Sequence, residues 1–145
     1  MHARSDPYPP AVRNNLIAIL SMIVAVSSLL YSAWRHEVTE DQRTVRQAGF
    51  EILRNLGELQ TIADHAHYSD DPLQGNPVSG WGRGLMVRDL STLMPQPAQH
   101  HAANLFKTWA AEWAGLGKQD SSSERITDSI NACRTETAHS IASLD

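Results

Sequence analysis

The pattern of apolar positions divides the chain into one uninterrupted apolar run and a longer amphipathic part. From Asn14 to Trp34 there are 21 residues without a charged side chain, most of them Leu, Ile, Val, Met, Ala or Ser. As a helix, this run rises about 32 Å, close to the roughly 30 Å thickness of the hydrocarbon core of a bilayer. The run therefore predicts a transmembrane helix at residues 14–34, after a short tail at residues 1–13.

Two other interpretations of the apolar run are a cleaved secretory signal and the core helix of a soluble domain. Residues 25–27 offer a small-residue cleavage site, but the apolar character continues beyond it. Tyr31 and Trp34 fit an interfacial aromatic belt, and Arg35 follows directly. The core helix of a soluble domain is usually apolar over a shorter stretch, so 21 consecutive uncharged residues argue against this interpretation. We therefore expect an uncleaved anchor, a signal anchor in its general form.

The flanking positive charges do not decide the direction of the anchor. Arg4, Arg13 and the α-amino group precede it, and Arg35, Arg43 and Arg46 follow within fifteen residues. Orientation follows the Lys and Arg residues near the membrane ends, and here they balance. The short tail slightly favours a periplasmic domain, whereas the arginines after the run fit the reverse topology.

Apolar residues recur every seven positions from the anchor into the next segment. This spacing is typical of one helical face, so we expect a helix at residues 35–68 that continues directly from the anchor. Its first ten residues form a polar stalk, and its later half presents an apolar face. The repeating positions are Ile17, Val24, Tyr31, Val38, Val45, Ile52, Leu59 and Ala66.

A loop is predicted at residues 69–84, because this segment holds two prolines and four glycines. It is longer than most connections between helices. Within it, Trp81 lies between two glycines and could either anchor the loop on the core or contact a partner. We therefore include Trp81 among the candidate interaction residues.

Three further helices are expected at residues 85–94, 98–116 and 121–144. The second has an apolar face with two tryptophans, and the third begins with a Ser-x-x-Glu capping box and carries an apolar stripe. No segment alternates with a period of two, so no strand is expected. The predicted fold is all-α: an N-terminal transmembrane helix that continues into a small antiparallel helical bundle at residues 35–145.

Composition narrows the classes of partner. The chain has a net charge of −4, and the part after Trp34 holds 10 basic and 15 acidic residues. An acidic domain argues against binding to nucleic acid, which requires basic surfaces. The single cysteine, Cys133, excludes an internal disulfide and falls on an apolar stripe, as a structural thiol would. No nucleophile motif is present, so we expect no enzyme activity and no cofactor.

Small residues form a ribbon along one side of the predicted anchor. In lipid, close packing rather than hydrophobic expulsion holds helices together, so a ribbon of this kind favours contact with a second copy or with another membrane protein. Small residues are also common in any spanning helix, which leaves a neutral interpretation open. The ribbon consists of Ala18, Ser21, Ala25, Ser28 and Ser32.

A group of histidines and aspartates invites a metal interpretation. Two of the histidines are two positions apart and diverge on a helix, and no dense signature such as H-E-x-x-H is present. We therefore expect solvated polar residues at a helix end rather than a metal site. The weak candidate ligands are His65, His67, His100 and His101, with Asp64, Asp70 and Asp71 nearby.

Three segments are similar to a group of uncharacterised proteobacterial proteins that have an N-terminal anchor and a helical domain. They are YSAWRHEVTEDQRTVRQAGFEILRNLGELQ at 31–60, HYSDDPLQGNPVSGWG at 67–82 and RDLSTLMP at 88–95. The resemblance covers most of the chain and implies the bacterial inner membrane. It implies no activity and no site residue.

The favoured hypothesis is a non-enzymatic, single-pass membrane protein that serves as an accessory or scaffold subunit. The alternative is a sensory or small-ligand-binding module, with the loop at 69–84 and Trp81 over a pocket between helices. A metal-dependent protein is the least favoured.

Overall fold

The computed structural model describes residues 10–69 and 73–144, apart from the side chains of residues 10–14 and 38. The expected all-helical class is confirmed, because these residues form four α-helices, two short helical segments of other types and no strand. The elements are α1 (Pro10–Asp64), the π-helix η1 (His65–Ser69), α2 (Pro77–Ser91), α3 (Gln96–Glu112), the 3₁₀-helix η2 (Trp113–Gly115) and α4 (Asp120–Ala142).

The chain divides into two units, residues 1–41 and residues 42–145, and α1 contributes to both. In the first unit, every described side chain from residue 15 to residue 37 is exposed. Within the described residues, one helix is long and apolar enough to cross a membrane, with a mean hydropathy of 2.2 over an 18-residue window. A signal sequence passes the same test. Much of the predicted tail at residues 1–13 lies outside the described residues, although α1 already begins at Pro10.

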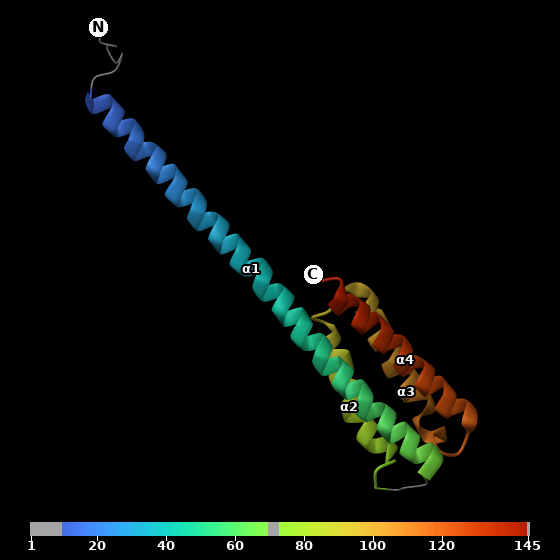
Figure 1. Cartoon of the computed structure of the whole chain (residues 1–145). Helices are drawn as coiled ribbons and strands as arrows, with labels where there is room; N and C mark the ends of the chain where they lie inside the picture. Colours follow the sequence, from blue (N-terminus) through green and yellow to red (C-terminus); the bar gives the residue numbers. More distant parts are fainter. Residues whose placement is uncertain (1–9, 70–72, 145) are drawn as a thin grey trace. The chain divides into compact units, whose positions relative to one another are not determined.

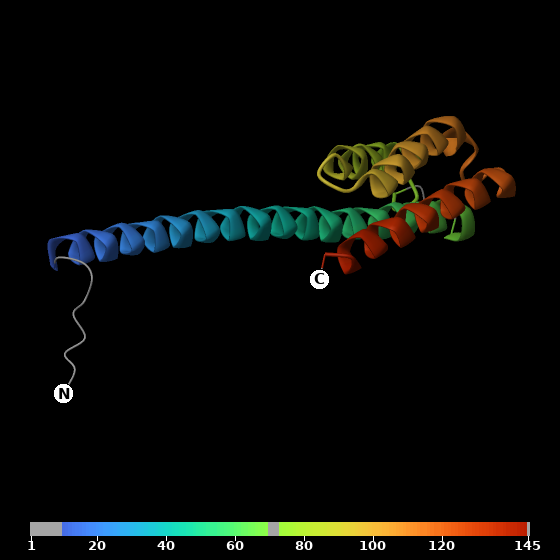
Figure 2. The same cartoon turned by 90° about the horizontal axis from the view of Figure 1, so that it is seen from above.

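The second unit has a core to which all four helices contribute. Successive helices run in alternating directions, and α4 lies alongside the C-terminal part of α1 (Figure 1 and Figure 2). The seven-residue repeat enters this core through Ile52 and Leu59, both almost fully buried. The largest buried apolar side chains are Ile52, Leu56 and Leu59 of α1, Val87 of α2, Leu105 and Trp109 of α3, and Ile126, Ile130 and Cys133 of α4.

The predicted loop at residues 69–84 is wrong over its second half, which is helical. The predicted helix at 85–94 is confirmed at residues 85–91, but it is the second part of a longer helix and ends three residues earlier than expected. Helix α2 begins at Pro77 and ends at Ser91. Between η1 and α2, residues 70–72 lie outside the described part of the chain. The Asn76 side chain accepts a hydrogen bond from the Val78 N–H at 3.0 Å, and Pro77 takes the first helical position. Both are signals of a helix start, so the Asn-Pro pair begins a helix here rather than forming a turn.

One glycine of this segment, Gly80, allows close packing between two helices. A Cβ atom at Gly80 would overlap the Trp109 ring of α3, so α2 approaches α3 closely only because Gly80 has no side chain. Gly82, two residues further on, has no neighbouring atom within 4 Å of the same position. The glycines led to the prediction of a loop, because the sequence alone does not show that Trp109 of another helix lies opposite Gly80.

The ends of α3 and α4 also differ from the prediction. Helix α3 runs from Gln96 to Glu112, and the last residues of the predicted segment 98–116 tighten into η2. Helix α4 begins at Asp120, so Ser121 already lies inside the first turn and the expected capping box with Glu124 does not form. The Ser122 hydroxyl instead donates to the Glu112 carboxylate at 2.6 Å, which ties α4 to α3.

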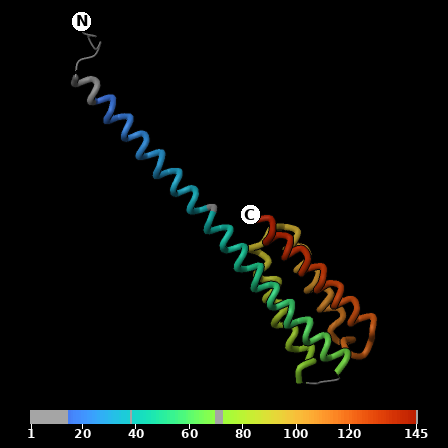
Figure 3. Tube along the Cα trace, in the orientation of Figure 1, coloured from blue at the N-terminus to red at the C-terminus, as the bar shows by residue number. Residues whose placement is uncertain are grey.

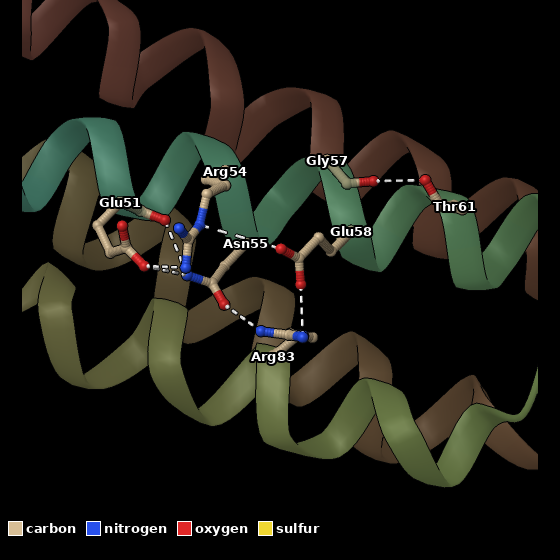
Figure 4. Close-up of polar contacts among 7 residues, drawn as sticks. All are labelled: Glu51, Arg54, Asn55, Gly57, Glu58, Thr61 and Arg83. Carbon is tan, nitrogen blue, oxygen red and sulfur yellow. Dashed lines mark hydrogen bonds and ion pairs between the residues drawn. The ribbon is translucent and has the colours of Figure 1, made fainter. Parts of the chain in front are cut away.

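One polar cluster ties α2 to α1. Arg83 of α2 forms an ion pair with Glu58, with 2.6 Å between Nη2 and Oε2, and its Nη1 donates to Asn55 Oδ1 at 3.4 Å (Figure 4). Asn55 is buried, and its amide also donates to the Glu51 carbonyl at 2.8 Å. Arg54, by contrast, pairs with carboxylates of its own helix within the described residues.

Different segments of the chain meet at the two ends of the second unit. The turn between α2 and α3 lies at the same end as the C-terminal part of α4 (Figure 3). The opposite end gathers η1, the first residues of α2 and α4, and the last turn of α3. Segments far apart in the sequence therefore meet at this second end.

Candidate functional site

The small residues predicted to form a contact ribbon are all exposed on α1, at positions Ala18, Ser21, Ala25, Ser28 and Ser32. The Ser21 hydroxyl donates to the Ile17 carbonyl and the Ser28 hydroxyl to the Val24 carbonyl, both at 2.8 Å. Both hydroxyl protons are hydrogen-bonded within the helix, which lowers the cost of placing these side chains in an apolar environment. The ribbon can therefore face lipid or another helix.

An aromatic pair follows at the end of the apolar run. Tyr31 and Trp34 are exposed, and their ring centroids are 6.3 Å apart with tilted planes. Both rings have one polar atom on a large apolar body, which suits the boundary between lipid and water. Their place in the helix matches the end of the predicted span.

Trp81 lies in α2, not in a loop, and is partly buried. Its ring packs edge-on against Phe106, with centroids 5.6 Å apart, and against Trp113, with centroids 6.1 Å apart. Trp109 is fully buried in the core. These contacts give Trp81 a packing role between α2 and the end of α3.

The histidines of the metal hypothesis lie on separate elements. His65 and His67 belong to η1, whereas His100 and His101 are adjacent on α3, with ring centroids 5.9 Å apart. Across residues 10–69 and 73–144, no group of three or more His, Cys, Asp or Glu side chains could hold a metal ion. Asp70 and Asp71, which the hypothesis also used, lie outside the described residues.

A cleft that the sequence analysis missed lies where the end of α1 and η1 meet the start of α4. Its volume is about 410 Å³. One wall follows the helical spacing 60, 63, 64, 67 on α1 and η1, and the other follows 120, 123, 124, 127, 128 on α4. The lining residues are Gln60, Ala63, Asp64, His67, Tyr68, Asp120, Ser123, Glu124, Thr127 and Asp128.

Two of the residues that line the cleft each have a buried polar atom without a hydrogen-bond partner in the described part of the chain. The Gln60 amide nitrogen donates to Asp64 Oδ1 at 2.7 Å and to Thr127 Oγ1 at 3.3 Å, but its oxygen Oε1 is buried without a hydrogen bond. The hydroxyl of Ser123, a residue only 6% exposed, is also buried and unpartnered. Such atoms are uncommon in native proteins and call for an explanation.

Cys133 lies in the core of α4 and is fully buried. Burial in apolar surroundings raises the pKa of its thiol from 9.0 to about 11, although a hydrogen bond with Thr137 acts in the opposite direction. The thiolate is the reactive form of cysteine, so this thiol is unreactive at neutral pH.

The acidic row of the cleft could have been found in the sequence, because Asp120, Glu124 and Asp128 follow at four-residue intervals at and just after the start of the helix predicted at 121–144. The opposite wall could not, since nothing in the sequence places the end of α1 beside the start of α4. Comparisons of the chain with protein-family models, with curated proteins and with solved structures found no match.

Proposed function

We propose that this protein is a single-pass protein of the bacterial inner membrane that acts as a non-enzymatic accessory or scaffold subunit. In this proposal, residues 14–34 span the bilayer and residues 35–145 form a small antiparallel helical bundle. The observation that carries the proposal is the apolar stretch of α1, whose most hydropathic 18-residue window has no buried residue.

The exposed side chains of this stretch support a lipid environment. Large apolar side chains there are 50–75% exposed, among them Leu16, Met22 and Leu29. Contiguous apolar patches of this extent are rare on soluble monomers and mark membrane or protein contacts. Polar hydroxyls in the same stretch bond to their own helix, which lipid requires.

The proposed partner is a second copy of the chain or another membrane protein, reached through the small-residue ribbon. Ala25 and Ser28 lie in its middle, and neither has a bulky side chain to hold a neighbouring backbone away. The acidic domain after the anchor disfavours anionic lipid surfaces as its target. The domain is therefore left free to contact a protein.

A matched pair of substitutions tests the ribbon. Full-length chains labelled with donor or acceptor dyes are reconstituted in vesicles, and self-association is measured by energy transfer. The double substitution Ala25→Leu with Ser28→Leu should abolish association, whereas Ser27→Leu, also small-to-large but off the ribbon, should leave it intact. Equal energy transfer in all three proteins would remove the ribbon from the proposal.

A second measurement tests the accessory role. Mild-detergent purification of the tagged chain from its own membranes should return a stable oligomer or a stoichiometric membrane-protein partner. Recovery of only the monomeric chain would contradict the role. A reporter fused after residue 145 assigns the side of the membrane: periplasmic activity supports the favoured topology and cytoplasmic activity the reverse.

A further inference from the structure

One exposed face of α1 in the second unit carries arginines and a phenylalanine together. Six of its positions lie within about 80° of one another around a helix of 3.6 residues per turn, and they extend over about 27 Å of its axis. All six are exposed or half-exposed, and none is acidic. The outward face, as we call this set, consists of Arg43, Arg46, Phe50, Arg54, Gly57 and Thr61.

The outward face differs in charge from the rest of the domain. The chain after Trp34 holds 10 basic and 15 acidic residues, whereas the outward face holds three arginines and no acid. Two carboxylates flank it toward α2, where Arg54 contacts Glu51 at 2.8 Å and Glu58 at 3.9 Å (Figure 4). Glu58 also pairs with Arg83 of α2. The outward face is therefore a basic strip on an acidic domain.

Phe50 gives this strip an apolar centre. Its side chain is 58% exposed, although burial of a phenylalanine is favourable by about 2 kcal/mol. It borders an open hollow of about 580 Å³. Aromatic residues and arginine are the types enriched at the centres of protein interfaces. The hollow is lined by Arg43, Arg46, Gln47, Phe50, Glu51 and Arg54.

Gly57 is an independent indication that a helix binds here. A glycine inside a helix costs about 1 kcal/mol relative to alanine, and the packing that explains Gly80 is absent at Gly57. Among the described residues, no atom lies within 4 Å of the position that its Cβ would take. Figure 4 shows Gly57 on the side of α1 turned away from Arg83. Arg43, Phe50 and Gly57 are seven residues apart, the spacing along which two helices meet.

We propose that the outward face of α1 binds an acidic, amphipathic helix of another protein. Its carboxylates pair with Arg43 and Arg54, an apolar side chain covers Phe50, and its backbone comes close at Gly57. A second copy that offered the same face would set arginine against arginine. A lipid surface has no rigid backbone for which a glycine would make room. The inference goes beyond the proposed function, because it uses neither the anchor nor the small-residue ribbon.

Fluorescence anisotropy on the full chain in a zwitterionic detergent tests the proposal. The probe is a labelled model helix of three Glu-Leu-Ala-Ala-Glu-Leu-Ala repeats, and its control has Lys in place of Glu. We expect saturable binding of the Glu helix that weakens as salt is raised, and none of the Lys helix. Phe50→Ala should weaken binding about tenfold, because it removes the apolar centre. Arg43→Gln combined with Arg54→Gln should also weaken it about tenfold.

Two further variants separate binding from folding. Gly57→Glu places a carboxylate in open space and is favoured in a helix, so the chain should fold, yet it should bind the Glu helix about tenfold more weakly. The matched charge control is Lys107→Gln combined with Lys118→Gln. It removes two exposed positive charges outside the outward face and should change affinity less than about twofold. Circular dichroism confirms that each variant is folded.

Four results would overturn the proposal. The first is no saturable binding of the Glu helix, and the second is an equal loss of affinity in the lysine control and the arginine variant. The third is stronger displacement of the probe by dihexanoylphosphatidylglycerol than by unlabelled Glu helix, which would assign the face to lipid headgroups. The fourth is an oligomer, measured by light scattering, that the arginine substitutions dissociate, which would assign the face to a second copy.

Discussion

Two glycines of α2 provide a direct test of the packing between α2 and α3. Gly80 faces the ring of Trp109, which is fully buried and cannot move into solvent, whereas Gly82 faces open space. Replacing each glycine by alanine adds the same methyl group to the same helix. The two substitutions should therefore change stability in opposite directions.

The magnitudes follow from two terms. Alanine is favoured over glycine inside a helix by up to about 1 kcal/mol, and this gain applies at both positions. Overpacking a well-filled core costs about 1–3 kcal/mol, and the overlap of a Gly80 Cβ with the Trp109 ring places this site at the upper end. We expect Gly80→Ala to lower the free energy of unfolding by about 2 kcal/mol. Gly82→Ala should raise it by about 0.5–1 kcal/mol.

Urea unfolding of the full chain in mild detergent, followed by tryptophan fluorescence and by circular dichroism, measures both changes. The urea concentration at the midpoint of unfolding should fall for Gly80→Ala and rise for Gly82→Ala. The slope of the free energy of unfolding against urea concentration should stay unchanged. If both substitutions raise the midpoint, α2 does not approach α3 at Gly80. If Gly82→Ala lowers it, residue 82 is not in a helix and the loop expected from the sequence is restored.

Three further predictions concern separate parts of the chain. Arg83→Ala should lower the free energy of unfolding by about 1 kcal/mol in the same urea assay. The lost ion pair with Glu58 contributes little because it is partly exposed to solvent, but the buried Asn55 oxygen loses its hydrogen bond to Arg83. The control Arg54→Ala removes ion pairs within one helix and should lower the free energy of unfolding by less than about 0.5 kcal/mol. Folding raises the pKa of the Cys133 thiol to about 11, so the folded state holds the thiol proton more tightly than the unfolded state. The free energy of unfolding should therefore fall as pH rises from about 9 to about 11, and it should fall less in Cys133→Ala. Equal pH profiles of the two proteins would contradict the raised pKa. Val24→Arg should cost about 3 kcal/mol of membrane insertion and lower the carbonate-resistant fraction of the protein, and full retention in that fraction would contradict a span centred there.

Periodicity predicted the helices whose apolar faces enter the core. Ile52 and Leu59 of the seven-residue repeat are buried, as are Ile126 and Ile130 of the last stripe. These positions were predictable because one face of a helix must be apolar wherever it packs on a core. The apolar run of α1 was located differently, from 21 consecutive residues without a charged side chain.

Glycine and proline content misled the prediction of α2. Asn76 and Pro77 fit a turn as well as they fit a helix start, and only the hydrogen bond to Val78 distinguishes the two. Gly80 is present because of Trp109, which is distant in sequence. The cleft was missed for the same reason, since its two walls come together only through the packing of α4 against α1.

The central claim is that the apolar stretch of α1 is a retained membrane anchor. The most direct measurement is the intact mass of the chain recovered from carbonate-washed membranes of a cell that expresses it. The account predicts that the chain resists carbonate, dissolves in detergent and keeps its full mass of 16.0 kDa. Recovery in the soluble fraction, or a mass shortened at residues 25–27, would contradict the anchor.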